Sequence, residues 1–159
     1  MGGINVEEAK IKLIERLEGC INVVSMLLAL GCLITLAVLI YTFLSFSKLS
    51  KKEKIASPIG CSILICACLF NAFWLQPMLC DREYLKSNEP IYIAGELIDF
   101  ANASGDESGE VTRYSPIIRI YETDEKITLN ITNSEERMEI GETYEIIYLP
   151  NTKLGEIIE

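Results

Sequence analysis

The sequence from Cys20 to Phe46 reads CINVVSMLLALGCLITLAVLIYTFLSF, and the sequence from Pro58 to Cys80 reads PIGCSILICACLFNAFWLQPMLC. Neither run contains an Asp, Glu, Lys or Arg. A helix crosses the hydrocarbon core of a bilayer with about 20 apolar residues, and both runs reach that length. The pattern predicts two transmembrane helices, over residues 20–46 and 58–80, that form a helical hairpin.

The remaining segments are polar and divide the chain into further parts. Residues 1–19 mix apolar and charged positions and predict an amphipathic helix at the membrane surface, or alternatively a helical extension of the first span. Residues 47–57 form a basic loop, and residues 81–90 form a charged linker. Residues 91–159 are left to form one small folded domain.

The pattern of apolar residues changes to a period of two after residue 90. Ile127, Leu129 and Ile131 alternate with polar residues, which is typical of a half-buried strand. Clusters of turn residues separate several such segments, so we expect about five strands in an antiparallel, barrel-like domain. The predicted fold class is therefore an α+β membrane protein, with a two-helix transmembrane hairpin followed by a small all-β domain.

The composition of the β domain limits the classes of function. Residues 81–159 contain 18 acidic side chains and seven basic ones, so a basic groove for nucleic acid is not expected. The chain contains no His, the commonest general base and metal ligand. No arrangement of the other residues indicates a nucleophile or a metal set. We expect no catalytic residues, no metal, no cofactor and no enzymatic activity.

Small and weakly polar residues in the apolar runs predict how the two helices pack. Residues 22, 25, 29 and 32 recur at steps of three and four, which gives one helical face where another helix can approach closely. An antiparallel hairpin with Cys20 level with Cys80 brings residue 32 level with residue 68, and residue 29 level with residue 71. The candidate packing residues are therefore Asn22, Ser25, Ala29, Cys32, Cys68 and Asn71. The amide of Asn71 is expected to bond a backbone carbonyl across the hairpin.

All six cysteines lie in the two apolar runs. Cys20 and Cys80 lie at the same end of any such hairpin, and they could form a disulfide if that side of the membrane is oxidising. Two free thiols are the alternative, because the sequence does not fix a separation short enough for a bridge.

Four motifs occur in order in the β domain. They are Ala94-Gly95-Glu96-Leu97-Ile98, Tyr114-Ser115-Pro116-Ile117-Ile118-Arg119-Ile120, Ile140-Gly141-Glu142 and Tyr148-Leu149-Pro150-Asn151. In this order and spacing the region resembles the bacterial membrane-protein family called domain of unknown function 3592. The resemblance implies a β domain paired with one or two membrane helices, and the family has no assigned activity.

These observations predict a membrane-anchored, non-enzymatic binding or assembly module. The alternatives are a small immunity or inhibitor protein that protects a bacterium from a toxin, and an accessory subunit of a transporter or envelope complex. Expected partners are membrane lipid and either another protein or a second copy of the chain. Tyrosines are favoured at interfaces, so the candidate partner surface is Tyr114, Tyr121 and Tyr148.

The basic residues predict the orientation in the membrane. Four Lys are concentrated in the loop at residues 47–57, and the positive-inside tendency places that loop in the cytoplasm. The side of the termini has five basic residues that are more dispersed: Lys10, Lys12, Arg16, Arg82 and Lys86. We therefore expect a two-pass integral protein of the bacterial cell membrane with an extracytoplasmic β domain.

Overall fold

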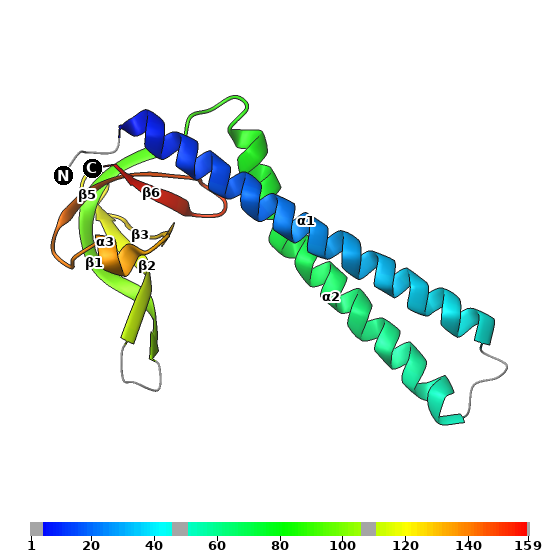
Figure 1. Cartoon of the computed structure of the whole chain (residues 1–159). Coiled ribbons are helices and arrows are strands. Elements are labelled where there is room, and N and C mark those ends of the chain that lie inside the picture. The colour runs from blue at the N-terminus through cyan, green and yellow to red at the C-terminus, as the bar shows by residue number, and fades with distance from the viewer. Residues whose placement is uncertain (1–4, 46–50, 106–110, 159) are drawn as a thin grey trace. The chain divides into compact units, whose positions relative to one another are not determined.

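The computed structural model describes residues 5–45, 51–105 and 111–158, and the chain divides into two compact units. The helical unit is Gly19–Leu79, and the sheet unit combines Met1–Glu18 with Cys80–Glu159. Figure 1 shows two long helices, α1 and α2, and a curled sheet. The elements are α1 Val6–Ser45, α2 Lys51–Tyr84, β1 Ile91–Gly105, β2 Val111–Ile120, β3 Lys126–Thr128, β4 Asn130–Ile131, α3 Ser134–Arg137, β5 Thr143–Tyr148 and β6 Leu154–Ile158.

Both long helices are apolar enough to cross a membrane, within Val6–Ser45 and Pro58–Tyr84. Only 0% and 6% of the residues in their most apolar windows are buried inside the protein. A core helix of a soluble domain would bury most of such a window against its own chain. The apolar side chains of these helices therefore face outward, which is what a membrane span requires.

Within the helical unit, reduced exposure follows a seven-residue repeat on both helices. The less exposed positions alternate in steps of three and four, which gives a period of 3.5 residues and is the geometry of a left-handed helix pair. They are Ile21, Val24, Leu28, Gly31, Thr35, Val38 and Thr42 on α1, and Cys61, Leu64, Cys68, Asn71, Leu75 and Met78 on α2.

We call these less exposed positions the seam. On the first helix, the seam differs from the predicted packing face. Asn22, Ala29 and Cys32 are exposed, and Ser25 is half-buried. The less exposed positions Ile21, Val24, Leu28 and Gly31 each lie one residue earlier in the sequence than the four predicted positions, so the face is rotated by about 100° from the predicted one. A small side chain at the seam is required only at Gly31, where a Cβ would lie 3.2 Å from Cys68 Sγ.

The second helix continues beyond the predicted end of its span. Pro77 lies inside α2, which runs on to Tyr84. A proline removes one backbone hydrogen bond and does not by itself end a helix. Residues 81–84, which were expected to begin a linker, form the last turn of this helix, and they belong to the sheet unit.

The sheet has six strands in the order β3-β2-β1-β5-β6-β4. Every pair is antiparallel except β4 with β6, which is parallel. Gly141 has φ +94° in the turn before β5, as the motif around it predicted. The number of strands is six, where the sequence led us to expect about five.

The prediction of a barrel is wrong, because the sheet is open. β3 and β4 are its two edges, although only Leu129 separates them in the chain. The N–H of Leu129 donates to the carbonyl of Pro116 in β2, and the next N–H, of Asn130, donates to the carbonyl of Lys153 before β6. The sheet therefore curls until one segment contacts both ends, but β3 and β4, which follow each other along that segment, do not pair with each other.

The concave face of the sheet encloses the hydrophobic core. Its buried members are Ile93, Leu97, Ile118, Leu129, Ile131, Met138, Ile146, Tyr148 and Ile157. Residues that alternate with these along the strands point to the opposite face, which we call the outer face. On β5 and β6 this outer face is also buried, at Ile147, Glu156 and Ile158.

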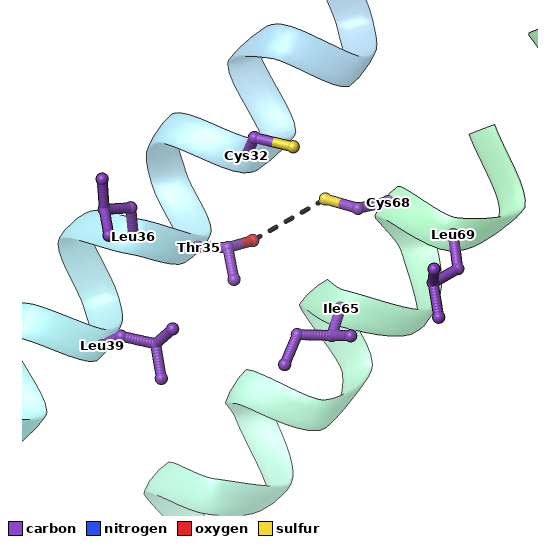
Figure 2. Close-up of a pocket in the computed structure, with 7 residues that line it drawn as sticks. All are labelled: Cys32, Thr35, Leu36, Leu39, Ile65, Cys68 and Leu69. Atoms are coloured by element: carbon purple, nitrogen blue, oxygen red, sulfur yellow. Dashed lines mark hydrogen bonds between the residues drawn. The ribbon is translucent and has the colours of Figure 1, made fainter. Parts of the chain in front are cut away.

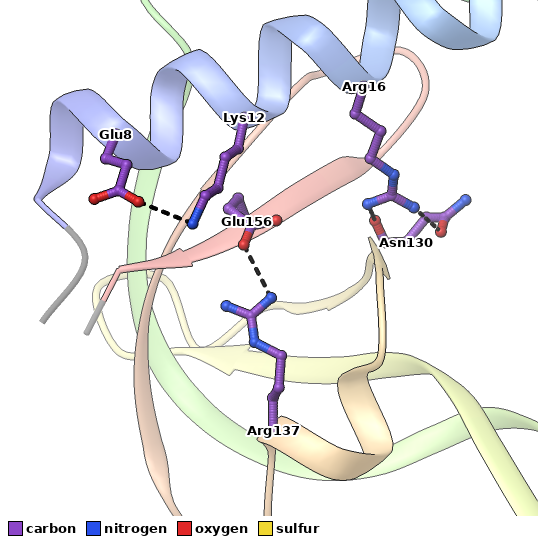
Figure 3. Close-up of polar contacts among 6 residues, drawn as sticks. All are labelled: Glu8, Lys12, Arg16, Asn130, Arg137 and Glu156. Carbon is purple, nitrogen blue, oxygen red and sulfur yellow. Dashed lines mark hydrogen bonds and ion pairs between the residues drawn. The ribbon is translucent and has the colours of Figure 1, made fainter. Parts of the chain in front are cut away.

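The first turns of α1 cover the buried part of the outer face. Ala9, Leu13 and Leu17 recur every four residues and are 0–1% exposed. Figure 3 shows this part of α1 passing over β6. The backbone is one continuous helix from Val6 to Ser45, which corresponds to the alternative of a helical extension. The apolar stripe that suggested a membrane-surface helix is used inside the sheet unit.

Candidate functional site

Asp81 is the most completely enclosed charged side chain in the described part of the chain, at 0% exposure. One carboxylate oxygen accepts hydrogen bonds from the backbone N–H and the side-chain amide of Asn151, at 2.9 and 2.8 Å. The other accepts from the N–H and the hydroxyl of Thr152, at 2.7 and 2.5 Å. These four donors replace the water that a carboxylate loses on burial.

This cluster joins the last turn of α2 to the turn between β5 and β6. Asn151 belongs to the Tyr-x-Pro-Asn motif noted in the sequence, and Thr152 follows it. Asp81 accepts four hydrogen bonds from this one turn, so its arrangement is that of a structural anchor. Sequence reasoning missed it, because an Asp after an apolar run is usually the solvated start of a linker.

Polar contacts also surround the buried stripe of α1 within the sheet unit (Figure 3). The guanidinium of Arg16 donates to the carbonyl and the side-chain oxygen of Asn130, at 3.1 and 2.9 Å. Lys10 contacts both carboxylate oxygens of Glu89 at 2.8 Å, and this hydrogen bond raises the pKa of the lysine. The first turns of α1 are therefore attached to both β4 and the segment before β1.

A buried ion pair supports the same region. Arg137 of α3 contacts Glu156 of β6 at 2.9 Å, and the carboxylate side chain is only 9% exposed. Figure 3 shows this pair below the first turns of α1. Because the carboxylate already has a cationic partner, we assign the pair to the structure of the sheet unit rather than to chemistry.

In the helical unit, Cys32, Thr35 and Cys68 lie together at a cavity of about 290 Å³ that is otherwise lined by aliphatic side chains. The hydroxyl of Thr35 donates to the carbonyl of Gly31 at 2.8 Å and lies 3.8 Å from Cys68 Sγ. Figure 2 shows the thiols of Cys32 and Cys68 pointing toward each other from α1 and α2. Cys32 and Cys68 therefore lie at the same height along the two helices, as the antiparallel alignment of the sequence predicted.

Oxidation of the protein in detergent with iodine should join Cys32 to Cys68. The two thiols would lose two electrons and two protons to the oxidant, and most of the protein should contain this disulfide because the thiols already face each other. Mass spectrometry of unreduced peptides measures the product. Replacing Cys32 by Ser should abolish it, whereas replacing the exposed Cys66 by Ser should not. A Cys66 cross-link in place of the Cys68 one would contradict this register.

The structure gives the hydrogen-bond partner of Asn71 and the state of the six cysteines. Asn71 lies on the seam, but its amide donates to the carbonyl of Ala67 in its own helix at 2.9 Å, not across the hairpin. All six cysteines are free thiols. Cys20 lies in the helical unit and Cys80 in the sheet unit, and a disulfide between them stays a prediction.

The three candidate tyrosines do not form one surface. Tyr148 is 9% exposed and belongs to the core, where burial raises the pKa of its hydroxyl. Its ring is also covered by Lys153, with Nζ 5.4 Å from the ring centre. Tyr114 and Tyr121 are exposed, at 46% and 55%. A role for Tyr148 in contacting a partner is therefore not supported by its position.

Tyr92 is an exposed tyrosine that sequence reasoning did not select, at 51% exposure on β1. The alternation of residues 91–93 could have identified it, since Ile91 and Ile93 point into the core and Tyr92 points out. Its hydrogen bond with Glu145, followed by partial desolvation and the charges of Glu145 and Glu122, raises the pKa of its hydroxyl. Tyr92 and Tyr121 thus share the outer face.

The described residues contain no group of three or more Cys, Asp or Glu side chains arranged to hold a metal ion. Comparisons with protein-family models, with curated proteins and with solved structures find no match. The candidate site therefore rests on the structure alone. It is the exposed outer face of the sheet around Tyr92 and Tyr121, in a unit that is continuous in sequence with two apolar helices.

Proposed function

We propose that this chain is a two-pass integral membrane protein whose sheet unit binds another protein without catalysing a reaction. The observation that supports it most is the exposure of both apolar helices, whose windows are 0% and 6% buried. Transfer of such a surface into lipid is favourable, at about 25 cal/mol for each Å² removed from water. A folded unit attached to such helices is held near other membrane proteins, which raises its effective concentration there.

The orientation and cellular setting are part of the same proposal. The basic segment with Lys48, Lys51, Lys52 and Lys54 lies in the cytoplasm, and the sheet unit lies outside. Residues 51–57 of this segment, which were expected in a loop, form the first turns of α2. The proposed setting is the cell membrane of a bacterium. The acidic sheet unit would steer association toward a basic partner.

Chemical cross-linking in intact cells tests binding and orientation together. A membrane-impermeant, amine-reactive cross-linker should join the sheet unit to its partner through exposed lysines, such as Lys126 and Lys153. We expect one adduct of constant mass on electrophoresis. Replacing both lysines by Arg keeps the charge but removes the reactive amines, and it should reduce this adduct severalfold.

The outcomes of this experiment separate the two parts of the proposal. An adduct that forms only with a permeant analogue of the cross-linker would reverse the orientation and leave binding standing. The absence of any adduct with both reagents would contradict the binding function itself.

A further inference from the structure

The outer face changes from covered to open along the strands. Beneath the first turns of α1, Ile147 and Ile158 are 3% and 8% exposed. Further along the same strands and on β1 and β2, the outer-face residues are exposed or half-buried. We call this open part the tyrosine face; it consists of Tyr92, Ala94, Glu96, Arg119, Tyr121, Thr143 and Glu145.

The strand register places these residues side by side. Ala94 is paired with Glu145 on one side, and its carbonyl accepts from the N–H of Tyr121 at 3.1 Å on the other. Glu96 is paired with both Arg119 and Thr143. Residues directly opposite each other in an antiparallel pair point to the same side of the sheet, so all of them share one face.

The hydroxyls of both tyrosines are held by neighbours on the sheet. The hydroxyl of Tyr121 lies 2.6 Å from Thr143 Oγ1, and Tyr92 bonds Glu145. Ala94 lies in the row between them and offers only a methyl group. The polar tips of both rings are thus held by neighbours on the sheet, while half of each side chain stays exposed.

This face carries more carboxylates than cations: Glu96, Glu122 and Glu145 against Arg119 and Lys126, which is paired with Arg119 across β2 and β3. Glu96 is neutralised by its ion pair with Arg119. The residues paired with Glu145 on the neighbouring strands, Ala94 and Ile158, carry no charge, and Glu122, in the turn after β2, adds a second carboxylate close enough to affect Tyr92. Exposed aromatic rings beside carboxylates favour guanidinium and ammonium groups, through charge attraction and cation–π contact.

The chain's own basic segment does not fit as the occupant of this face. The lysine-rich segment at residues 47–57 lies in the sequence between the two apolar runs, at their ends away from residues 18 and 80. If both helices span the bilayer, the loop of any copy lies on the opposite side of the membrane from the sheet unit. The occupant must therefore be a segment of a different protein.

We propose that the tyrosine face binds an arginine- or lysine-rich segment of a partner protein, seated across Tyr92 and Tyr121 with its basic groups at Glu145 and Glu122. This inference rests on the proposed binding function and specifies its surface and the chemistry of its partner.

The test uses the full chain in nanodiscs of neutral phosphatidylcholine, so that lipid does not attract the probe. The probe is a fluorescein-labelled peptide in which four arginines alternate with glycine, and fluorescence anisotropy measures its dissociation constant. The double variant Glu122→Gln with Glu145→Gln should weaken binding about five- to tenfold. Replacing Tyr92 and Tyr121 by Leu should weaken it by a similar factor.

Matched controls decide whether the face is specific. Glu15 and Glu136 are exposed and lie off the tyrosine face, so Glu15→Gln with Glu136→Gln removes the same charge and should change binding less than twofold. Tyr114→Leu is the control for the tyrosines. Near-UV circular dichroism checks that every variant is folded.

Two results would overturn the inference. The first is that the wild-type chain does not bind the peptide. The second is that the control and test variants weaken binding equally, which would mean general attraction to an acidic protein. In either case, an adduct in the intact-cell experiment would leave the binding function in place, so the two failures are distinguishable.

Discussion

Replacement of Asp81 by Ala should lower the unfolding temperature of the sheet unit by about 10–20 °C. The carboxylate accepts four hydrogen bonds from Asn151 and Thr152 at 0% exposure, and its removal leaves these donors without their partner. The cost of leaving buried polar groups unsatisfied is about 3 kcal/mol in total. Near-UV circular dichroism is a suitable measurement, because every tyrosine except Tyr41 lies in the sheet unit.

Two further variants make this result specific. Asp81→Asn keeps the shape of the side chain but turns an amide N–H₂ toward groups that themselves donate, so it should destabilise nearly as much as Ala. Glu83→Ala lies two residues further along the chain, where the side chain is exposed and pairs only with Lys86. That control should change the unfolding temperature by less than about 2 °C. If Asp81→Ala matched Glu83→Ala, Asp81 would not be an anchor.

The anchor illustrates which parts of this structure the sequence could predict. The two apolar runs and the alternation in the β domain are local patterns, and both correspond to elements in the structure. The Asp81 cluster joins residues about 70 positions apart, and neither end has a local pattern that points to the other. A sequence reader sees a charged residue after an apolar run and a Pro-Asn turn, each with an ordinary local explanation.

The errors in helix packing and sheet closure have a similar origin. Small residues at Asn22, Ala29 and Cys32 suggested a packing face, but the less exposed positions follow a 3.5-residue repeat that includes large side chains such as Leu28 and Val38. Sheet closure depends on how the two ends of the sheet meet, and in the structure both ends are consecutive parts of one short stretch, residues 126–131. Strand count and period are visible in the sequence, whereas the meeting of two edges is a property of the folded sheet.

Leu13 provides the second test, because its position decides between two readings of the first helix. Leu13 is 1% exposed within the sheet unit, so Leu13→Ala should leave a cavity and lower the free energy of unfolding by about 2–5 kcal/mol. Mass spectrometry can follow hydrogen exchange of the β6 segment on the full chain in detergent. The protection of β6 should fall by a factor of about 30 or more, because protection depends exponentially on the free energy of unfolding divided by RT.

The matched control is Ile11→Ala, two residues earlier on the same helix, where the side chain is 50% exposed. It removes a comparable apolar side chain and should change the exchange of β6 only slightly, since little buried surface is lost. A membrane-surface helix would give a different pattern: both variants would weaken membrane attachment, and neither would alter β6. Equal protection of β6 in the Leu13 and Ile11 variants would therefore show that the first turns of α1 do not belong to the core of the sheet unit.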